Sequence, residues 1–302
     1  MTEALLVEAF TAEPCRGNGA AVVLLEQPVR DAWMQQLARS LRQSETAFLL
    51  PRQEHWQLRW FTPTCEVPLC GHATLASLLA LEHWQRLGQD RATVFATRSG
   101  ALQARLRPDG LGEINLPTTP LLPDRAPDYL GELLQRHSNS TCQGFWRSAL
   151  GYSVALLDDT AEIERCPVLA PWLQPQEATG LVVMQGCNPE ANKAAIETAA
   201  SGAVHAHYRL RFFAPGMGID EDPVTGSAHA LVAPYWMDKL DRDSVVGWQC
   251  SPSPGGMVCD RGSSGMIRLA GAGVVLWDGS LNLNSETCAA SASRWLEVCA
   301  IG

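Results

Sequence analysis

One short segment of the chain occurs twice, and this repeat decides the predicted fold. The first copy is Phe61-Thr62-Pro63 followed by Glu66-Val67-Pro68-Leu69-Cys70-Gly71-His72-Ala73, and the second is Phe213-Ala214-Pro215 followed by Glu221-Asp222-Pro223-Val224-Thr225-Gly226-Ser227-Ala228. Each copy runs into an apolar stretch, residues 73–84 and 228–237, with few polar positions on any side. Such a stretch is typical of a helix buried on most of its surface. The repeat therefore predicts two related halves with a site between them, faced by two helix N-termini.

The repeat extends upstream of this junction, where each half has the order strand, short helix, strand. In the first half we expect these elements at residues 19–25, 32–42 and 46–50, and in the second at 151–157, 166–173 and 179–184. Arg59-Trp60-Phe61 then matches Arg211-Phe212-Phe213, and polar residues at 205, 207, 209 and 211 predict a strand with one polar face. The second half also inserts a predicted helix at 189–200.

These patterns predict an α+β fold of two pseudo-symmetric domains, each a β-barrel-like sheet wrapped around one central α-helix. Prolines crowd residues 117–127, where they oppose both helix and central strand and so mark a linker. We place the N-terminal barrel domain at residues 1–118 and the C-terminal barrel domain at 119–277. Short strands at 266–269 and 273–277 precede a weakly helical stretch at 285–298, and we expect the tail 278–302 to pack back on the N-terminal domain.

Composition limits the classes of function. The 302 residues carry a net charge of −9, with 46% hydrophobic and 18% charged residues, which is an ordinary balance for a globular protein with a large core. The absence of any Lys/Arg run argues against a nucleic-acid or anionic-membrane surface. We find no signal-peptide pattern and no apolar run near the ~20 residues that span a bilayer. We therefore expect a cytoplasmic protein whose ten cysteines are reduced.

Five motifs occur in a fixed order along the chain. They are Gly17-Asn18-Gly19-Ala20-Ala21-Val22-Val23, Ser44-Glu45-Thr46-Ala47-Phe48, Arg59-Trp60-Phe61-Thr62-Pro63, Pro68-Leu69-Cys70-Gly71-His72-Ala73-Thr74 and Asp222-Pro223-Val224-Thr225-Gly226-Ser227-Ala228. Together they resemble the PhzF-like phenazine-biosynthesis family, part of the diaminopimelate-epimerase-like superfamily. The resemblance covers nearly the whole chain and implies two barrel domains with the active site in the cleft between them. It also implies a cofactor-independent isomerase that moves a proton on a small carboxylic acid, in a biosynthetic family whose members are commonly homodimers.

Glu45 is the first candidate for catalysis. It precedes a predicted strand, and aligning Thr46-Ala47 with Thr179-Gly180 places Ala178 opposite it. A scaffold carboxylate would be expected in both halves, whereas a catalytic one is needed once. The resemblance puts the family's acid/base glutamate at this position. Burial in a closed cleft is expected to raise its pKa toward neutrality, and the structural alternative is a solvated glutamate at a strand end.

His72 and Asp222 are the other two catalytic candidates. An imidazole can give or take a proton near pH 7, and the resemblance places His72 at the site. The alternative for His72 is a hydrogen-bonded structural histidine. Asp222 stands where the first copy has Val67, and the resemblance places it near the substrate. The alternative for Asp222 is a carboxylate that stabilises the dipole of the following helix.

The substrate-binding candidates are residues whose backbone or polar side chain can hold a carboxylate. Free N–H groups at a helix N-terminus bind anions, and glycine allows close approach. The candidates come from the two helix starts and the two upstream motifs: Asn18, Ser44, Gly71, Ala73, Gly226 and Ser227. Asn18 between glycines is equally typical of a tight turn, and Ser227 of an ordinary N-cap.

Cys70 suggests a second mechanism, in which thiols act as the bases. Racemases of the same superfamily use two thiols, one per half, and Cys70 matches one of these places. The second copy has Thr225 there, and a threonine hydroxyl is too weak a base to replace a thiolate, so we expect Cys70 to be a packed thiol. No third ligand is spaced to complete a metal site with His205 and His207, and we predict none. Pro254 stands where an Arg often precedes the glycines of a loop in family members.

Three functions follow from these residues. The preferred one is a cofactor-independent isomerase in which Glu45 moves a proton on a small carboxylate, giving a double-bond shift or an epimerisation. A single clear carboxylate base favours the shift. The alternatives are a racemase or epimerase of amino acids that depends on Cys70, and a non-catalytic ligand-binding module on the same scaffold. We expect no cofactor, no nucleic-acid or membrane partner, and a homodimer.

Overall fold

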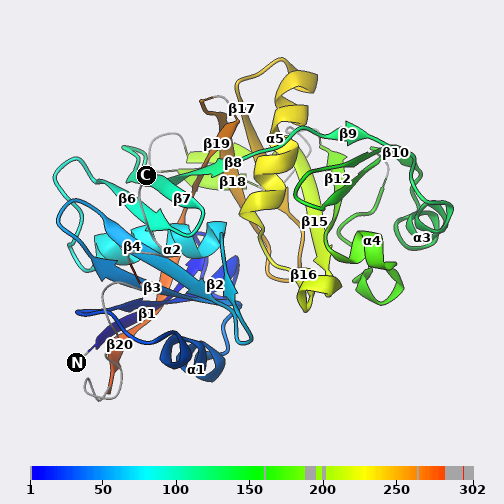
Figure 1. The fold of residues 1–302 in the computed structure, drawn as a ribbon. Coiled ribbons are helices and arrows are strands. Elements are labelled where there is room, and N and C mark those ends of the chain that lie inside the picture. The colour runs from blue at the N-terminus through cyan, green and yellow to red at the C-terminus, as the bar shows by residue number, and fades with distance from the viewer. Residues whose placement is uncertain are drawn as a thin grey trace. The chain divides into compact units, whose positions relative to one another are not determined.

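The computed structural model describes residues 2–159, 161–187, 195–198, 202–263, 265–282 and 295. Within this part of the chain, the ribbon in Figure 1 forms two compact units. The described residues of Met1–Asn115 and Ala270–Gly302 form unit 1, and those of Leu116–Leu269 form unit 2. Each unit is a mixed α+β structure in which strands surround one long apolar helix, as the sequence predicted.

In unit 1 the strands follow the order β20-β1-β2-β3-β4-β6-β7-β8, and β5 pairs with β4. The β2/β3 and β4/β6 pairs are parallel, and the others are antiparallel. The bounds are β1 (Thr2–Ala9), β2 (Asn18–Leu24), β3 (Glu45–Pro51), β4 (Trp56–Phe61), β5 (Glu66–Val67), β6 (Ala92–Thr97), β7 (Gly100–Leu106), β8 (Gly112–Pro117) and β20 (Gly273–Leu281), with helices α1 (Asp31–Leu41) and α2 (Gly71–His83).

The central helix of unit 1 is α2, which packs against β1, β2, β3, β7 and β20. Nine of its thirteen residues are buried, because apolar side chains occupy every side of the helix. Its buried hydroxyls are satisfied within the helix: Thr74 donates to the carbonyl of Cys70 at 2.5 Å, and Ser77 donates to that of Ala73 at 2.7 Å. The amphipathic α1 covers a smaller core cluster through Met34 and Ala38.

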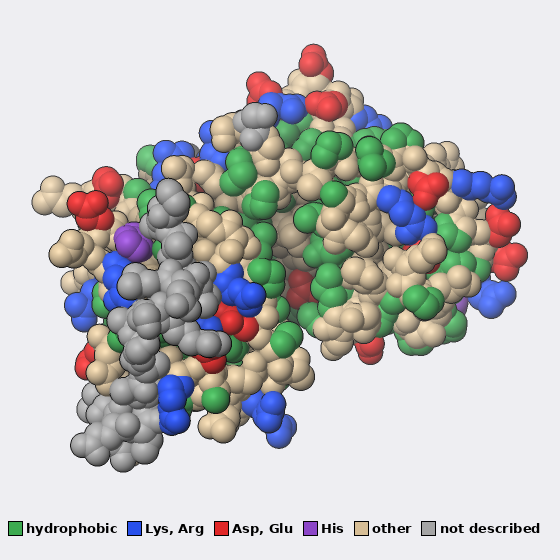
Figure 2. Space-filling view, in the orientation of Figure 1, with side chains coloured by type: hydrophobic (Ala, Val, Ile, Leu, Met, Phe, Trp, Pro, Cys, Tyr) green, Lys and Arg blue, Asp and Glu red, His purple; other side chains and the backbone are tan. Residues whose placement is uncertain are grey.

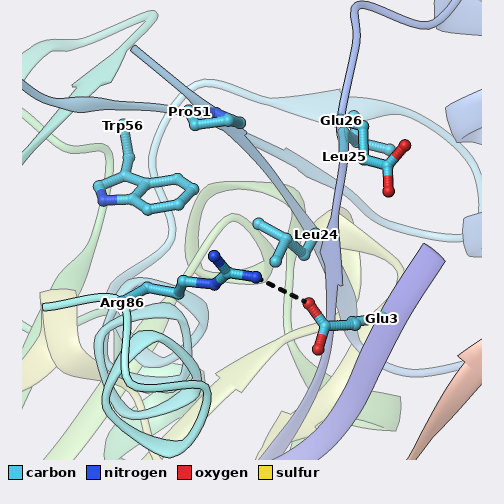
Figure 3. Close-up of a pocket in the computed structure, with 7 residues that line it drawn as sticks. All are labelled: Glu3, Leu24, Leu25, Glu26, Pro51, Trp56 and Arg86. Atoms are coloured by element: carbon cyan, nitrogen blue, oxygen red, sulfur yellow. Dashed lines mark ion pairs between the residues drawn. The ribbon is translucent and has the colours of Figure 1, made fainter. Parts of the chain in front are cut away.

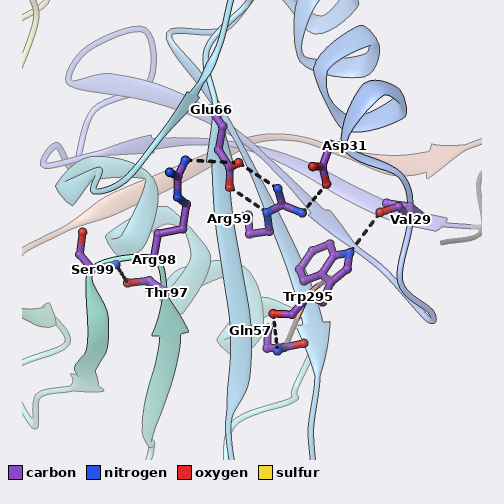
Figure 4. Close-up of polar contacts among 9 residues, drawn as sticks. All are labelled: Val29, Asp31, Gln57, Arg59, Glu66, Thr97, Arg98, Ser99 and Trp295. Atoms are coloured by element: carbon purple, nitrogen blue, oxygen red, sulfur yellow. Dashed lines mark hydrogen bonds and ion pairs between the residues drawn. The ribbon is translucent and has the colours of Figure 1, made fainter. Parts of the chain in front are cut away.

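Trp295 adds to this smaller cluster from the C-terminal end of the chain. Its indole N–H donates to the carbonyl of Val29 at 3.1 Å, and its own carbonyl accepts from the amide of Gln57 at 3.1 Å. Figure 4 shows the ring beside Arg59, whose guanidinium lies 5.1 Å from the ring centroid. The rest of the helical stretch predicted at 285–298 lies outside the described residues.

In unit 2 the strands follow the order β9-β10-β11-β12-β15-β17-β18, with parallel β11/β12 and β15/β17 pairs, and β16 pairs with β15. The β13/β14 pair forms a separate two-stranded sheet. The strand bounds are β9 (Leu122–Pro123), β10 (Cys142–Arg147), β11 (Ser153–Leu157), β12 (Leu181–Gly186), β13 (Ala195–Thr198), β14 (Gly202–His205), β15 (Tyr208–Ala214), β16 (Ile219–Asp222), β17 (Ser244–Gln249), β18 (Gly255–Arg261) and β19 (Met266–Gly271). The helices are α3 (Asp128–Ser138), α4 (Pro175–Ala178), α5 (Gly226–Leu240) and the 3₁₀ turns η1 (Ala170–Trp172) and η2 (Pro215–Met217). The long helix α5 packs against β17 and β18.

The strand registers align the two halves residue by residue. In unit 1, Thr46 pairs with Ala21 on one side and with Phe61 on the other. In unit 2, the equivalent pairings are made by Leu181, with Ser153 and Phe213. The helix starts agree with this alignment, because Cys70 and Thr225 are the residues that precede α2 and α5.

This alignment corrects one prediction. Since Thr46 corresponds to Leu181, the counterpart of Glu45 is Gly180, not Ala178. The predicted alignment was wrong by two residues because it matched the recurring threonines, whereas Ala178 and Thr179 belong to the end of the one-turn helix α4. The inference drawn from it stands, since Gly180 carries no carboxylate either.

Two further predictions about secondary structure were wrong. His205 ends β14 and β15 begins at Tyr208, so His205 and His207 do not share one face of a strand. His207 instead accepts the backbone N–H of Val246 at 2.9 Å. Of the helix predicted at 189–200, residues 195–198 form β13, and the others lie outside the described residues.

The surface carries mixed charge. On the face drawn in Figure 2, basic and acidic side chains are interspersed, and neither sign forms a continuous area. Within the described part of the chain, no helix is both long and apolar enough to cross a membrane.

Candidate active site

Unit 1 brings Glu45 and His72 into direct contact. Glu45 is the first residue of β3, and His72 is the second residue of α2. The central helix packs against β3, so the start of the strand meets the start of the helix. Glu45 Oε2 lies 3.0 Å from His72 Nε2, and the two side chains are only 11% and 7% exposed. Glu45 is therefore not a solvated residue at a strand end, and His72 has a carboxylate partner.

The charge state of this pair differs from the one expected. Burial alone would raise the pKa of Glu45, but the positive charge of His72, together with polar contacts from His72, Ser44 and Cys70, outweighs burial and lowers that pKa. Burial alone would lower the pKa of His72, but the negative charges that Cys70 and Glu45 can carry raise it well above its ordinary value. The expectation of a raised pKa at Glu45 was wrong, because it counted burial and not the imidazolium beside the carboxylate.

One oxygen of Glu45 is poorly satisfied. Oε2 is fully buried and makes no aligned hydrogen bond to any described group, so its contact with His72 is an ion pair without the geometry of a directed bond. A buried carboxylate oxygen normally accepts one or more hydrogen bonds. An unsatisfied one is therefore available to accept a proton from a bound molecule.

Ser44 and Asn18 complete the polar group around this pair. The Ser44 hydroxyl lies 3.2 Å from His72 Nε2, 3.1 Å from Asn18 Oδ1 and 3.0 Å from the carbonyl of Gly19. Asn18 is 1% exposed and is the first residue of β2, so the tight-turn alternative for this residue was wrong. The parallel pairing of β2 with β3 sets Ala20 opposite Glu45, and Asn18, two residues earlier on β2, contacts Ser44.

Cys70 contacts the same imidazole. Its Sγ lies 3.5 Å from His72 Nδ1, and it is 8% exposed. Burial and the nearby charge of Glu45 raise the pKa of the Cys70 thiol, and this outweighs the opposing effect of His72. At neutral pH Cys70 is therefore a thiol and not a thiolate, which agrees with the expectation of a packed thiol and disfavours the two-thiol mechanism.

The start of α2 supplies the backbone donors. Among the described residues, no side chain caps this helix, and its first-turn N–H groups, those of Gly71, His72 and Ala73, have no carbonyl partner within the helix. A helix N-terminus of this kind carries partial positive charge and binds anions. The predicted substrate-binding residues Gly71 and Ala73 thus lie beside the Glu45–His72 pair in unit 1.

A buried arginine fixes the strand that leads to this helix. Arg59 donates to both carboxylate oxygens of Glu66, at 2.8 and 2.9 Å, and to Asp31 at 2.8 Å, as Figure 4 shows. Beyond β6, Arg98 lies 3.5 Å from Glu66, and the Ser99 hydroxyl donates to the carbonyl of Pro68 at 2.8 Å. These contacts hold residues 66–68, and with them the start of α2, at a fixed place on the sheet.

Unit 2 has the corresponding junction with different side chains. Thr225 donates its hydroxyl to Asp222 Oδ2 at 2.5 Å, and both residues are 7% exposed. The amide of Gln249 spans the same loop: it donates to the carbonyl of Asp222 at 2.6 Å and accepts the N–H of Thr225 at 2.8 Å. Arg211 and Glu221 form the bidentate pair equivalent to Arg59 and Glu66.

Gln249 is a residue that the sequence analysis missed. It is fully buried at the end of β17, and it holds the loop that carries Asp222. The available signal was its place in a loop motif, Gln249-Cys250-Ser251, whose role the sequence alone did not reveal. Ser227 is the second residue of α5 and lies 3.3 Å from the Tyr152 hydroxyl, so it is not an ordinary N-cap; Thr225 has that position.

The structure thus groups the predicted site residues within each unit. Unit 1 gathers Asn18, Ser44, Glu45, Gly71, His72 and Ala73, and unit 2 gathers Asp222, Gly226 and Ser227. That the two groups share one cleft stays a prediction.

A separate pocket of about 320 Å³ lies elsewhere in unit 1. Figure 3 shows Arg86 reaching past Trp56 and Leu24 toward Glu3, and the ion pair between Arg86 and Glu3 spans 3.7 Å. The pocket is lined by Glu3, Leu24, Leu25, Glu26, Pro51, Trp56 and Arg86. None of these is a predicted site residue.

Sequences of known proteins match this chain over nearly its whole length. The profile of the PhzC-PhzF family, described as phenazine biosynthesis-like protein, matches residues 7–274. Phenazine biosynthesis-like domain-containing protein 1 of Mus musculus is 33% identical over 295 residues, which cover 91% of this chain and 97% of the mouse protein. An uncharacterized isomerase of Halalkalibacterium halodurans is 34% identical over 257 residues, which cover 85% of this chain and 89% of that protein.

Solved structures agree. A PhzF-family phenazine biosynthesis protein of Enterococcus faecalis superposes with a TM-score of 0.76 at 27% identity, covering 94% of this chain and 100% of that one. A hydroxyproline epimerase of Agrobacterium vitis superposes with a TM-score of 0.52 over 92% of each chain at 13% identity, a likeness of fold alone. The fold is therefore of the diaminopimelate-epimerase-like class, as the sequence predicted. Within that class, the chain belongs to the PhzC-PhzF family of phenazine biosynthesis-like proteins.

Proposed function

We propose that this protein is an isomerase that moves a proton on a small carboxylic-acid metabolite, with Glu45 as the base. The observation that carries the proposal is the buried contact of Glu45 with His72, in which one carboxylate oxygen makes no aligned hydrogen bond. The relatives in Halalkalibacterium halodurans and Pseudomonas aeruginosa that are named as uncharacterized isomerases support the reaction class. The proposed step uses only groups of the chain itself.

In the proposed step, the substrate carboxylate binds at the N-terminus of α2. Glu45 Oε2 then removes a proton from a carbon next to an unsaturated or carboxylated centre, and the electron pair of the broken C–H bond moves into that neighbouring π system. The positive charge of His72 stabilises the resulting anion. Glu45, now protonated, returns the proton to another carbon, which shifts the double bond, or to the same carbon, which restores the substrate.

The low pKa of Glu45 fits this scheme. The ion pair keeps the carboxylate deprotonated and ready before substrate binds. A bound substrate carboxylate shares the charge of His72 and excludes water from the site, and both changes make Glu45 a stronger base. The basicity of the Glu45 carboxylate would therefore increase when substrate binds.

Proton exchange in heavy water tests the proposal. The purified protein is incubated with a panel of small unsaturated and carboxylated acids in D₂O, and deuterium incorporation is followed by NMR. We expect at least one acid to exchange, and Glu45→Gln to lower the rate by about 10²- to 10⁴-fold. Glu113→Gln is the matched control, because Glu113 is also buried in unit 1 but pairs with Arg105 and lies outside the candidate site. It should retain the activity.

The same experiment separates the alternatives. Exchange that survives Glu45→Gln but is lost in Cys70→Ser would favour the thiol-dependent racemase. No exchange across the panel would favour a ligand-binding module. The assembly of the chain as a homodimer stays a prediction, which sedimentation measurements can test separately.

A further inference from the structure

We propose that Glu45, Cys70 and His72 together form a binding site for a thiophilic divalent cation, foremost Zn²⁺, which blocks the proposed isomerase. The inference concerns the residues of the proposed function, but metal binding can be measured whether or not that function holds. It starts from geometry: one carboxylate oxygen, one thiol sulfur and one imidazole nitrogen all lie within 4.8 Å of one another.

The separations fit tetrahedral coordination. Cys70 Sγ lies 3.5 Å from Nδ1 and 3.9 Å from Nε2 of His72, and Nε2 lies 3.0 Å from Glu45 Oε2. Metal–ligand bonds of about 2.3 Å to sulfur and about 2.0–2.2 Å to nitrogen and oxygen place tetrahedral ligands roughly 3.3–3.6 Å apart. The third separation, between Cys70 Sγ and a carboxylate oxygen of Glu45, is at most 4.8 Å. Side-chain movements of about an ångström or less would therefore bring the three ligands around one ion.

The donor set selects the class of metal. Thiolate and imidazole ligands favour Zn²⁺ and Co²⁺, whereas Mg²⁺ and Ca²⁺ require oxygen ligands. Three protein ligands leave a fourth position for water or a carboxylate, as in zinc sites that keep one open position. Binding would release to solvent the thiol proton of Cys70 and the extra proton of His72, because a ligating thiol is deprotonated and a ligating imidazole is neutral.

The surroundings restrain the ligands. Cys70 and His72 flank the first residue of α2, and Glu45 starts β3, so both elements hold their ligands from the backbone. The Ser44 hydroxyl lies 3.2 Å from His72 Nε2 and 3.1 Å from Asn18 Oδ1, so polar contacts restrain the imidazole before an ion binds. The positive end of the α2 dipole opposes a cation, so the affinity is expected to be weaker than that of a structural zinc site.

The pseudo-symmetry of the chain fixes the stoichiometry. The counterparts of Glu45, Cys70 and His72 in unit 2 are Gly180, Thr225 and Ser227, which offer no comparable ligand set. Among the residues that the structure describes, no other group of three His, Cys, Asp or Glu side chains has this spacing. One ion per chain is therefore expected. With the Glu45 carboxylate and the His72 nitrogen bound to metal, neither could take part in proton transfer.

Co²⁺ is the spectroscopic probe for this site. The metal-free protein is titrated with Co²⁺ and then with competing Zn²⁺, in a Cys15→Ser/Cys65→Ser background that removes the two thiols that are exposed among the described residues. We expect a thiolate-to-cobalt charge-transfer band that saturates at one ion per chain. Cys70→Ser should abolish the band, and Glu45→Gln should weaken Zn²⁺ binding by at least about tenfold. Cys166→Ser, which removes a buried thiol in unit 2, should leave both unchanged.

The proposal is overturned if the band is missing in the parent protein, or if it persists in Cys70→Ser. Circular dichroism confirms that each variant is folded, and since Ser differs from Cys by one atom, loss of fold does not explain a missing band. The two proposals fail separately. A saturable cobalt band together with exchange that survives Glu45→Gln would contradict the isomerase mechanism alone. A missing cobalt band together with exchange that is lost in Glu45→Gln would contradict the metal site alone.

Discussion

The junctions that precede α2 and α5 share a backbone plan but differ in chemistry. In both, an arginine forms a bidentate ion pair with a glutamate, Arg59 with Glu66 and Arg211 with Glu221. Both junctions end in a glycine that starts a buried helix. Between these fixed points, the first junction carries the ionisable Cys70-Gly71-His72 sequence and the second carries Thr225-Gly226-Ser227. The repeated residues build the scaffold, and the residues that differ are the ones to which we assign the proposed chemistry.

The contacts that hold each junction also differ in number. Glu66 is shared between Arg59 and Arg98, and Arg59 has Asp31 as a second carboxylate partner. In unit 2, Glu221 is 6% exposed and pairs with Arg211, which also donates to the carbonyl of Cys166. Among the described ion pairs, the Glu221 carboxylate therefore depends more heavily on a single arginine than the Glu66 carboxylate does.

The largest expected effect follows from that difference. Arg211→Met would leave Glu221 charged and buried without its partner, so we expect a loss of about 3–5 kcal/mol in the free energy of unfolding. Arg59→Met should cost at least about 1 kcal/mol less, because Arg98 remains beside Glu66 and Asp31 is more exposed. Urea unfolding followed by far-ultraviolet circular dichroism measures both.

Arg105→Met serves as the control for this pair of variants. Arg105 pairs with Glu113, but its side chain is 57% exposed, and its removal should cost less than about 1 kcal/mol. Equal losses for Arg59→Met and Arg211→Met would show that the extra partners in unit 1 contribute nothing to its stability.

The two central helices also differ at their fourth residue, which is a threonine in α2 and a histidine in α5. Thr74 in α2 and His229 in α5 make the same backbone hydrogen bond, to the residue before the helix, at 3.1 Å. Thr74 is neutral, whereas His229 is fully buried against the Tyr208 hydroxyl, and burial lowers the pKa of His229 to about 3. Between about pH 6.5 and pH 3 the unfolded chain binds a proton at this residue that the folded chain does not.

Stability must therefore fall as the pH falls through this window, by up to about 1.4 kcal/mol per pH unit from this one group. Between pH 6.5 and pH 4.5 His229 would account for roughly 2–3 kcal/mol. His229→Gln keeps a polar side chain near Tyr208 but cannot titrate, so its loss of stability over the same range should be smaller by that amount. If the free energy of unfolding of the two proteins changed with pH in the same way, His229 would ionise normally in the folded state.

Much of this architecture could be predicted from the sequence. The all-round apolar stretches identified α2 and α5, and the five motifs identified the family and the residues now found around Glu45. Errors arose where the answer depended on contacts distant in sequence. The lowered pKa of Glu45 depends on His72, which only the packing of α2 on β3 brings to it. Gln249 was missed because its role exists only once β17 lies beside the loop that carries Asp222.

Gly180, the counterpart of Glu45 in unit 2, is the site of the smallest expected change in unfolding free energy. Gly180 has no room for a side chain: a Cβ there would lie 2.5 Å from Tyr152 Cδ1 and 3.0 Å from two ring atoms of Phe212. Gly180→Ala should therefore cost about 1–3 kcal/mol through overpacking. Gly131→Ala in α3 is the matched control, because no neighbouring atom of the described part of the chain lies within 4 Å of the added Cβ, and it should stabilise the helix by about 0.5–1 kcal/mol.

If both alanine variants gave the same unfolding free energy, Gly180 would be an ordinary loop glycine, and unit 2 could have carried a second carboxylate at this place. A clear penalty at Gly180 alone would mean that the ring pair of Tyr152 and Phe212, with centroids 4.9 Å apart, fills the space that a side chain would need. The backbone position that presents Glu45 in unit 1 would then be closed in unit 2 by packing. The single acid/base carboxylate would be a consequence of how the second half is filled, and not only of which residue happens to stand there.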